Sequence, residues 1–220
     1  MNIGLLGFGV VGGGVWELAQ ENRALNVKKV LVRREAPSLG KAAVQDVEAI
    51  LRDTDIDTVV EVLGGLHPAY EWICQALAAG KDVVTANKAV ISAYYRELTA
   101  LAHENGAALR CTAAVGGGIP WLVNLQRCRR VDTVTEVGGI MNGTTNFIMD
   151  AMARQGADFP AVLQRAQELG YAEADPSADI DGDDIRRKLT ISANIAFDAL
   201  LREEDIPAFG IRTVTGADVA

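Results

Sequence analysis

The sequence predicts an α/β protein with two domains: a doubly wound parallel sheet in residues 1–130 and a smaller α+β domain in residues 131–220. Short apolar runs alternate with helix-patterned segments through the first half, as in folds whose parallel strands are joined by helices. A glycine-rich turn follows the first apolar run, and the alternation stops after a second glycine-rich stretch near residue 116. Helical crossovers at this spacing are right-handed, which gives a sheet of the Rossmann type.

Composition limits the classes of function. The 220 residues are 49% hydrophobic and 23% charged, as in ordinary globular proteins. A net charge of -8 argues against nucleic-acid and membrane-surface partners, which favour a basic face. No apolar run is long enough to span a bilayer, and Met1 leads directly into a predicted strand without signal-peptide regions. We therefore expect a cytoplasmic protein that acts on a small molecule.

Cysteine and histidine usage excludes two further classes of site. Cys74, Cys111 and Cys128 are scattered without a CxxC spacing, and the chain has only two histidines. This pattern supports neither a disulfide framework nor a zinc site. We expect three buried thiols in a reducing compartment.

A strand at residues 2–6 precedes the GFGVVG turn, and a helical segment follows it. In this context the first glycine permits a tight turn, the second lets the backbone approach a pyrophosphate, and the third allows close helix packing. The helix N-terminus offers free amides to the phosphates. The alternative is a glycine-rich turn without a ligand. The predicted cofactor-binding residues here are Gly7, Phe8, Gly9, Val10, Val11 and Gly12.

The second strand, residues 27–32, ends in Arg33 and Arg34, where an NAD enzyme usually has an acidic residue for the ribose hydroxyls. Two arginines suit a 2′-phosphate, so the sequence favours NADP. Glu35 could still serve a ribose, which keeps NAD open, and a solvated strand end is the alternative for the arginine pair.

The remaining elements of the first half continue the alternation. Ligands of such sheets bind beyond the strand C-termini, so Gly64 and Lys88, which follow two of the strands, are expected at the cofactor edge. The predicted helices are 46–52, 67–79, 94–104 and 121–129, and the predicted strands are 58–63, 82–85 and 107–111.

The second half has few strand signals. A strand is predicted at 131–141 and a weak one at 211–214, with helices from about 147, at 163–169 and at 184–201. Two strands do not form a stable sheet. We expect that a partner subunit completes it or that the chain stops before its natural end.

Residues 170–188 combine acidic side chains with one lysine. Asp184 and Lys188 lie four residues apart on one helix face, an arrangement suited to proton transfer to a small polar substrate. A solvated acidic surface is the alternative. A calcium loop is excluded, because Lys188 would occupy the position of its bidentate glutamate. The NGTTN segment at 142–146 could bind a carboxylate or only cap a helix.

Taken together, several motifs resemble the homoserine dehydrogenase family: GFGVVG, TANKA at 85–89, VGGGIP at 115–120, GIMNGTTNF at 139–147, GYAEADP and DIDGDDIRRKLTI. The resemblance covers nearly the whole chain. It implies an NAD(P)-dependent oxidoreductase that interconverts aspartate semialdehyde and homoserine in threonine, methionine and isoleucine biosynthesis, as a homodimer or higher homo-oligomer.

By position, the resemblance implies that Lys188 donates a proton to the aldehyde oxygen, with Asp184 beside it. The substrate-binding residues that it implies are Glu173, Asp179, Asp184, Lys88, Gly143 and Thr144. At the cofactor it implies Lys88, Gly170 and Glu173 besides the glycine turn.

The resemblance also implies a monovalent cation such as sodium, bound by the backbone carbonyls of Val115, Gly117 and Ile119. Thr112 stands where the family has a glutamate ligand. A plain domain hinge is the alternative for this glycine-rich segment. The competing functions are aspartate-semialdehyde dehydrogenase, with Cys111 as the candidate nucleophile, and a non-catalytic NADP-binding module.

Overall fold

The computed structural model describes residues 1–219 of the chain, which divide into two compact units. The first unit is Met1–Asn124 and the second begins at Leu125. None of the helices in the described residues is both long and apolar enough to cross a membrane.

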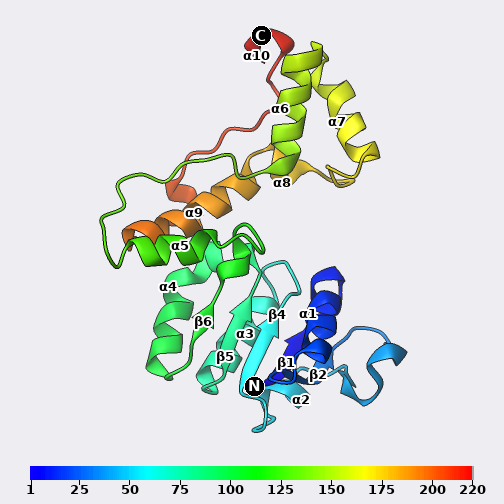
Figure 1. The fold of residues 1–220 in the computed structure, drawn as a ribbon, viewed down its shortest axis with the longest axis vertical. Coiled ribbons are helices and arrows are strands. Elements are labelled where there is room, and N and C mark those ends of the chain that lie inside the picture. The colour runs from blue at the N-terminus through cyan, green and yellow to red at the C-terminus, as the bar shows by residue number, and fades with distance from the viewer. Residues whose placement is uncertain (220) are drawn as a thin grey trace. The chain divides into compact units, whose positions relative to one another are not determined.

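A six-stranded parallel sheet in the order β3-β2-β1-β4-β5-β6 forms the centre of the first unit (Figure 1). This order is that of doubly wound dinucleotide-binding sheets, which confirms the predicted fold class. The strands are β1 (Asn2–Leu6), β2 (Asn26–Leu31), β3 (Ala43–Val44), β4 (Thr58–Glu61), β5 (Asp82–Thr85) and β6 (Leu109–Arg110).

The central strands are apolar on both faces because helices cover both faces of such sheets. Leu5 and Val30 are fully buried, and Trp16 of α1 packs against their cluster. The helices of this unit are α1 (Val10–Glu21), α2 (Glu48–Leu51), α3 (Ala69–Ala78) and α4 (Lys88–Glu104), with 3-10 turns η1 (Pro37–Ala42) and η2 (Thr112–Ala114). Helix α5 (Trp121–Cys128) contains the boundary between the units.

Two elements of the first unit differ from the sequence predictions. Strand β3 was not predicted, because two residues are too short to show an alternating pattern. Helix α4 begins at Lys88, six residues before the predicted start, and the prediction began at a kink, where Tyr94 has φ -128° and ψ 18°. Lys88, which follows β5, therefore lies in the first turn of a helix.

All regular secondary structure in the described residues of the second unit is helical. Figure 1 shows α6 and α7 side by side, and Ile148 and Met152 of α6 pack with Val162 and Ala166 of α7. The helices are α6 (Gly143–Gln155), α7 (Phe159–Glu168), α8 (Ser177–Ile180), α9 (Asp183–Phe197) and α10 (Gly216–Val219), with one 3-10 turn, η3 (Glu203–Asp205).

The strands predicted at 131–141 and 211–214 are absent from the described residues. A strand needs a neighbour for its backbone N–H and C=O groups, and this unit offers residues 131–141 none. Val131 and Ile140 are 87% and 82% exposed. Helix α9 also ends at Phe197 rather than 201, because Asp198 adopts a left-handed conformation (φ 53°) and its N–H bonds to Asn194 O.

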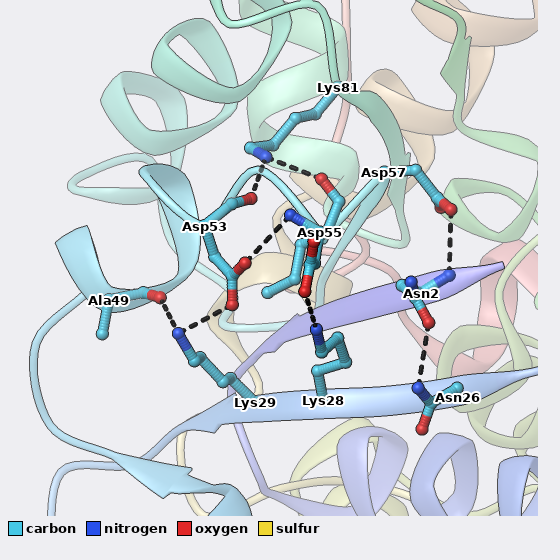
Figure 2. Close-up of polar contacts among 10 residues, drawn as sticks. Asn2, Asn26, Lys28, Lys29, Ala49, Asp53, Asp55, Asp57 and Lys81 are labelled. Carbon is cyan, nitrogen blue, oxygen red and sulfur yellow. Dashed lines mark hydrogen bonds and ion pairs between the residues drawn. The ribbon is translucent and has the colours of Figure 1, made fainter.

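A lysine-rich cluster closes the end of the sheet where the strands begin (Figure 2). Lys81 is 7% exposed. Its Nζ donates to Asp53 O and Ile56 O, both at 2.6 Å. Lys29 Nζ contacts Ala49 O at 2.7 Å and Asp53 Oδ2 at 2.8 Å. These contacts hold the connection between α2 and β4 against the sheet.

We expect Lys81→Met to destabilise the protein by about 2 kcal/mol, because it leaves two carbonyl oxygens without their buried donor. Lys28→Met is the matched control: Lys28 pairs at 2.8 Å with Asp55, whose side chain is 72% exposed, so its loss should change little. Urea denaturation of both variants measures the difference. Equal midpoints would contradict a structural role for Lys81.

Candidate functional site

The glycine turn has the geometry that dinucleotide binding requires. Gly7 has φ 107°, a conformation that favours glycine. A Cβ on Gly12 would lie 2.2 Å from Gly7 O, so only glycine allows α1 to approach the turn this closely. A Cβ on Gly9 would meet nothing within 4 Å, which leaves the space above the turn open. Phe8 is half-buried against the core.

The first turn of α1 presents amides to that space. Gly9 caps the helix without a side-chain hydrogen bond, and the first amides of a helix have no intrahelical acceptor. Val10 and Val11 are 96% and 55% exposed. The first turn of α1 therefore fits a nucleotide diphosphate, because helix N-termini bind phosphates through their N–H groups and the helix dipole.

The neighbouring strand C-termini carry the other predicted cofactor residues. Arg33 and Arg34 are exposed just beyond β2, which pairs in parallel with β1, so they lie at the same sheet edge as the glycine turn. Gly64 follows β4 and has φ 76°. Lys88 follows β5 as the first residue of α4, whose cap is Asn87: its Oδ1 accepts from Val90 N at 3.3 Å.

Glu61 also lies at this edge and was not among the predicted site residues. It is the last residue of β4 and is 0% exposed. Its carboxylate accepts from Thr85 Oγ1 at 2.6 Å, from Leu63 N at 2.8 Å and from Asn87 Nδ2 at 3.4 Å. The available signal was an acid inside the apolar run TVVEVL, since an unpaired acid is almost never fully buried.

In the second unit a partly buried polar cluster joins α9 to the N-terminus of α6. Lys188 Nζ lies 2.6 Å from Asp184 Oδ2 and donates to Met141 O at 2.7 Å. Asn142 Nδ2 donates to Asp184 Oδ2 at 2.9 Å and to Asp179 Oδ1 at 2.7 Å. The cluster is therefore Asp179, Asp184, Lys188, Met141 and Asn142. The lysine side chain is 18% exposed and the Asp184 side chain 5%.

Asn142 was predicted to bind a carboxylate or to cap a helix, as part of the NGTTN segment, but its contacts with Asp179 and Asp184 were not predicted. Its Oδ1 caps α6 by accepting from Thr145 N at 2.8 Å, which leaves both amide hydrogens for Asp179 and Asp184. The NGTTN segment thus caps a helix and also orients two carboxylates. The capping signal was visible in the sequence, whereas its partners lie 37 and 42 residues away.

The other predicted substrate and cofactor residues lie around the loop that follows α7. Thr144 Oγ1 donates to Tyr171 O at 2.7 Å, which ties the start of α6 to this loop. Gly143 is exposed in the first turn of α6. Gly170 has φ 78°, and Glu173 is exposed, with its backbone oxygen accepting from Gln167 Nε2 at 3.1 Å. The Glu173 side chain does not belong to the Asn142 cluster.

The acidic stretch therefore divides into two kinds of residue. Asp175 and Asp183 make local contacts with Ser177 and Arg186, and Asp181 pairs with Arg212, 31 residues along the chain. The Arg212 guanidinium holds the pKa of Asp181 below its usual value. Asp184 is buried and Asp179 half-buried in the Asn142 cluster. The interpretation as a solvated acidic surface fits the first three residues. The interpretation as a functional site fits Asp179 and Asp184.

The predicted cation ligands lie around a sharp turn. Val115 is buried, Gly117 has φ 58° and Ile119 is 67% exposed, with Ile119 N donating to Gly116 O at 3.0 Å. Thr112 begins η2. Through residue 219, no three His, Cys, Asp or Glu side chains are grouped so that they could hold a metal ion.

The cysteines correct one prediction and weaken one alternative function. Cys111 is buried, but Cys74 is half-buried and Cys128 is exposed at the end of α5. The prediction that all three thiols are buried was therefore wrong. Burial raises the pKa of Cys111 to about 11, which keeps it a thiol rather than a nucleophilic thiolate. Cys111 is thus unsuited to the covalent step of an aspartate-semialdehyde dehydrogenase.

Comparison with known proteins gives consistent matches over the whole chain. A family model described as homoserine dehydrogenase, NAD binding domain, matches residues 7–112, and one described as homoserine dehydrogenase matches residues 120–220. The chain is 44% identical to a homoserine dehydrogenase of Synechocystis, with 100% of the chain and 54% of that protein covered. It therefore spans about half the length of the curated relatives it matches.

The solved structures that the chain resembles include homoserine dehydrogenases as well. A homoserine dehydrogenase from Thiobacillus denitrificans is 40% identical with a TM-score of 0.94, over 100% of this chain and 54% of that one. A hyperthermophilic archaeal homoserine dehydrogenase in complex with NADPH is 27% identical with a TM-score of 0.84, over 98% of this chain and 75% of that one.

Proposed function

The chain belongs to the homoserine dehydrogenase family, and on that premise we propose that its protein interconverts L-aspartate 4-semialdehyde and L-homoserine with a nicotinamide cofactor. The observation that carries the proposal is the ion pair of buried Asp184 with half-buried Lys188, in which Asn142 also donates to Asp184 Oδ2. Such a pair can deliver a proton to a carbonyl oxygen. The reaction belongs to threonine, methionine and isoleucine biosynthesis.

The cofactor of the proposal is NADP, with NAD as the second choice. The glycine turn and the α1 amides would hold the diphosphate, and Arg33 with Arg34 would hold a 2′-phosphate. The NADPH bound by the archaeal relative supports this choice. When bound, the nicotinamide supplies the hydride that reduces the aldehyde carbon. Gly64, Lys88, Gly170 and Glu173 are the further cofactor residues of the proposal.

Lys188 is the proposed proton donor in the direction of reduction. Negative charge develops on the aldehyde oxygen as the carbon is reduced, and an ammonium beside it stabilises that charge and then gives up a proton. An ammonium has three N–H donors, of which Asp184 Oδ2 and Met141 O engage two. Holding the lysine by these two acceptors would orient the third donor toward substrate.

The amino-acid part of the substrate needs groups of both signs. Asp179 and Glu173 would bind the ammonium, because carboxylates form strong charge-assisted hydrogen bonds with amines. Gly143 and Thr144 at the N-terminus of α6 would bind the carboxylate, which helix N-termini favour. Lys88 would contact both substrate and cofactor, and Asp184 would contact the substrate as well as Lys188.

Three further features complete the proposal. The carbonyls of Val115, Gly117 and Ile119 would bind a monovalent cation such as sodium, with the Thr112 hydroxyl in place of the family's glutamate.

The protein would be a cytoplasmic homodimer or higher homo-oligomer. The exposed apolar side chains of Val131 and Ile140, in a segment without strand neighbours, support such an assembly. The proposed domains remain 1–130 for the cofactor and 131–220 for substrate and dimerisation.

The direct test is an assay of the intact protein with aspartate semialdehyde and NADPH, followed at 340 nm, together with homoserine oxidation in the reverse direction. Turnover in both directions supports the proposal. NADPH binding by fluorescence with no turnover of either substrate would instead favour a non-catalytic NADP-binding module.

Arg33→Asp should shift the preference from NADP toward NAD, because an aspartate repels the 2′-phosphate and accepts hydrogen bonds from ribose hydroxyls. We expect the ratio of kcat/KM for NADPH to that for NADH to fall by about tenfold or more, the loss of one charge-assisted contact. Arg23→Asp, an exposed arginine after α1, is the charge-matched control. An unchanged ratio would remove the argument for NADP.

A further inference from the structure

The buried carboxylate of Glu61 touches parts of the cofactor edge that are separated in sequence. It accepts hydrogen bonds from Leu63 N in the segment after β4, from Thr85 Oγ1 at the end of β5, and from Asn87 Nδ2 at the cap of α4. All three donors are neutral. A buried carboxylate is costly unless such contacts satisfy it, so its presence here needs a reason.

Asn87 extends the network to the segment that carries Gly64. Its Nδ2 also donates to Gly65 O at 2.7 Å, and its backbone N donates to Thr85 Oγ1 at 2.9 Å. Gly64 and Gly65 both have positive φ, at 76° and 73°, and a Cβ on either would meet nothing within 4 Å. Both glycines are exposed, and the Asn87 contact ties the Gly65 carbonyl to the start of α4.

We infer that Glu61 is a positioning residue for the cofactor: through Asn87 it sets the Gly64–Gly65 backbone and the first turn of α4, where Lys88 lies. Glu61 does not itself contact the nucleotide. The inference rests on the proposed binding of a nicotinamide cofactor at this edge of the sheet. It explains why an acid ends an otherwise apolar strand and why both amide hydrogens of Asn87 face acceptors.

Glu61→Leu tests the inference, because leucine keeps the side chain's bulk and removes every acceptor. We expect the Kd for NADPH, measured by fluorescence, to rise by about tenfold or more, and the KM for NADPH to rise more than kcat falls. Amides of residues 63–66 should exchange faster with deuterium in the cofactor-free protein. Glu61→Gln should restore part of the affinity, since its oxygen still accepts from Leu63 and Asn87 while the Thr85 hydroxyl loses its acceptor.

Thr58→Val is the matched control at the other end of β4. Thr58 is 3% exposed and donates to Asp57 Oδ1 at 2.8 Å, so its loss perturbs the same strand away from the cofactor edge. NADPH affinity should stay unchanged. If Glu61→Leu does not fold, Thr85→Val, which removes one of the three donors, replaces it.

The outcomes separate the inference from the proposed function. Failure of the unmodified protein to bind NADPH would overturn both. Normal NADPH affinity in a folded Glu61→Leu or Thr85→Val protein would overturn the positioning role alone. Equal losses of affinity in Thr58→Val and Glu61→Leu would also overturn it, since the effect would then be one of general stability.

Discussion

Lys188→Ala is expected to reduce turnover of aspartate semialdehyde by about 10²–10⁴-fold, the usual contribution of a positioned proton donor. NADPH binding should be nearly unchanged, because the Lys188 ammonium contacts Asp184 and Met141 within the second unit and is proposed to act on the aldehyde oxygen. Steady-state kinetics with NADPH titration by fluorescence measures both quantities.

Arg187→Ala is the matched control for this variant. Arg187 is the preceding residue of α9, and its Nε lies 3.3 Å from Glu203 Oε2, outside the Asn142 cluster. Its removal deletes a cation from the same helix, so turnover should change by only a few fold. Loss of turnover and of NADPH affinity to the same extent in Lys188→Ala would assign the lysine a structural role.

Gly9→Ala is expected to weaken NADPH binding by about tenfold or more, because the added methyl group would occupy space that a pyrophosphate needs. The fold should tolerate it. Gly9 has φ -88° and ψ -156°, which alanine can adopt, and the new Cβ would meet nothing within 4 Å. The thermal midpoint should therefore stay close to that of the unmodified protein while the Kd rises.

Gly14→Ala serves as the control on the same helix. Its Cβ also meets nothing within 4 Å, and alanine in a helix interior is about 0.5–1 kcal/mol more stable than glycine. This variant should bind NADPH normally and melt slightly higher. Unchanged NADPH affinity in Gly9→Ala would exclude the glycine turn as the diphosphate site.

Local patterns predicted most of the first unit. The apolar runs at 2–6, 27–32, 58–63 and 82–85 correspond to β1, β2, β4 and β5, because buried parallel strands need continuous apolar residues. The requirement for glycine at position 12 was equally local. Strand β3 and the early start of α4 were missed, since the first depends on its pairing with β2 and the second on a side-chain cap.

In the second unit the sequence misjudged the strands, since pairing depends on a neighbour that a local pattern does not contain. The i to i+4 relation of Asp184 and Lys188 follows from helix geometry and was predicted correctly as a contact. Their functional roles are still predictions.

The sequence by itself determined most strands of the first unit, the glycine turn and the acid–lysine pair, because each depends on residues only a few positions apart. The tertiary structure alone decided which acids are buried and what holds them. Glu61 accepts from Thr85 at the end of β5 and from Asn87 just beyond it, and Asn142 bridges Asp179 and Asp184 from 37 and 42 residues away. Hydrogen bonds across such separations exist only once the chain has folded, so no local pattern records them.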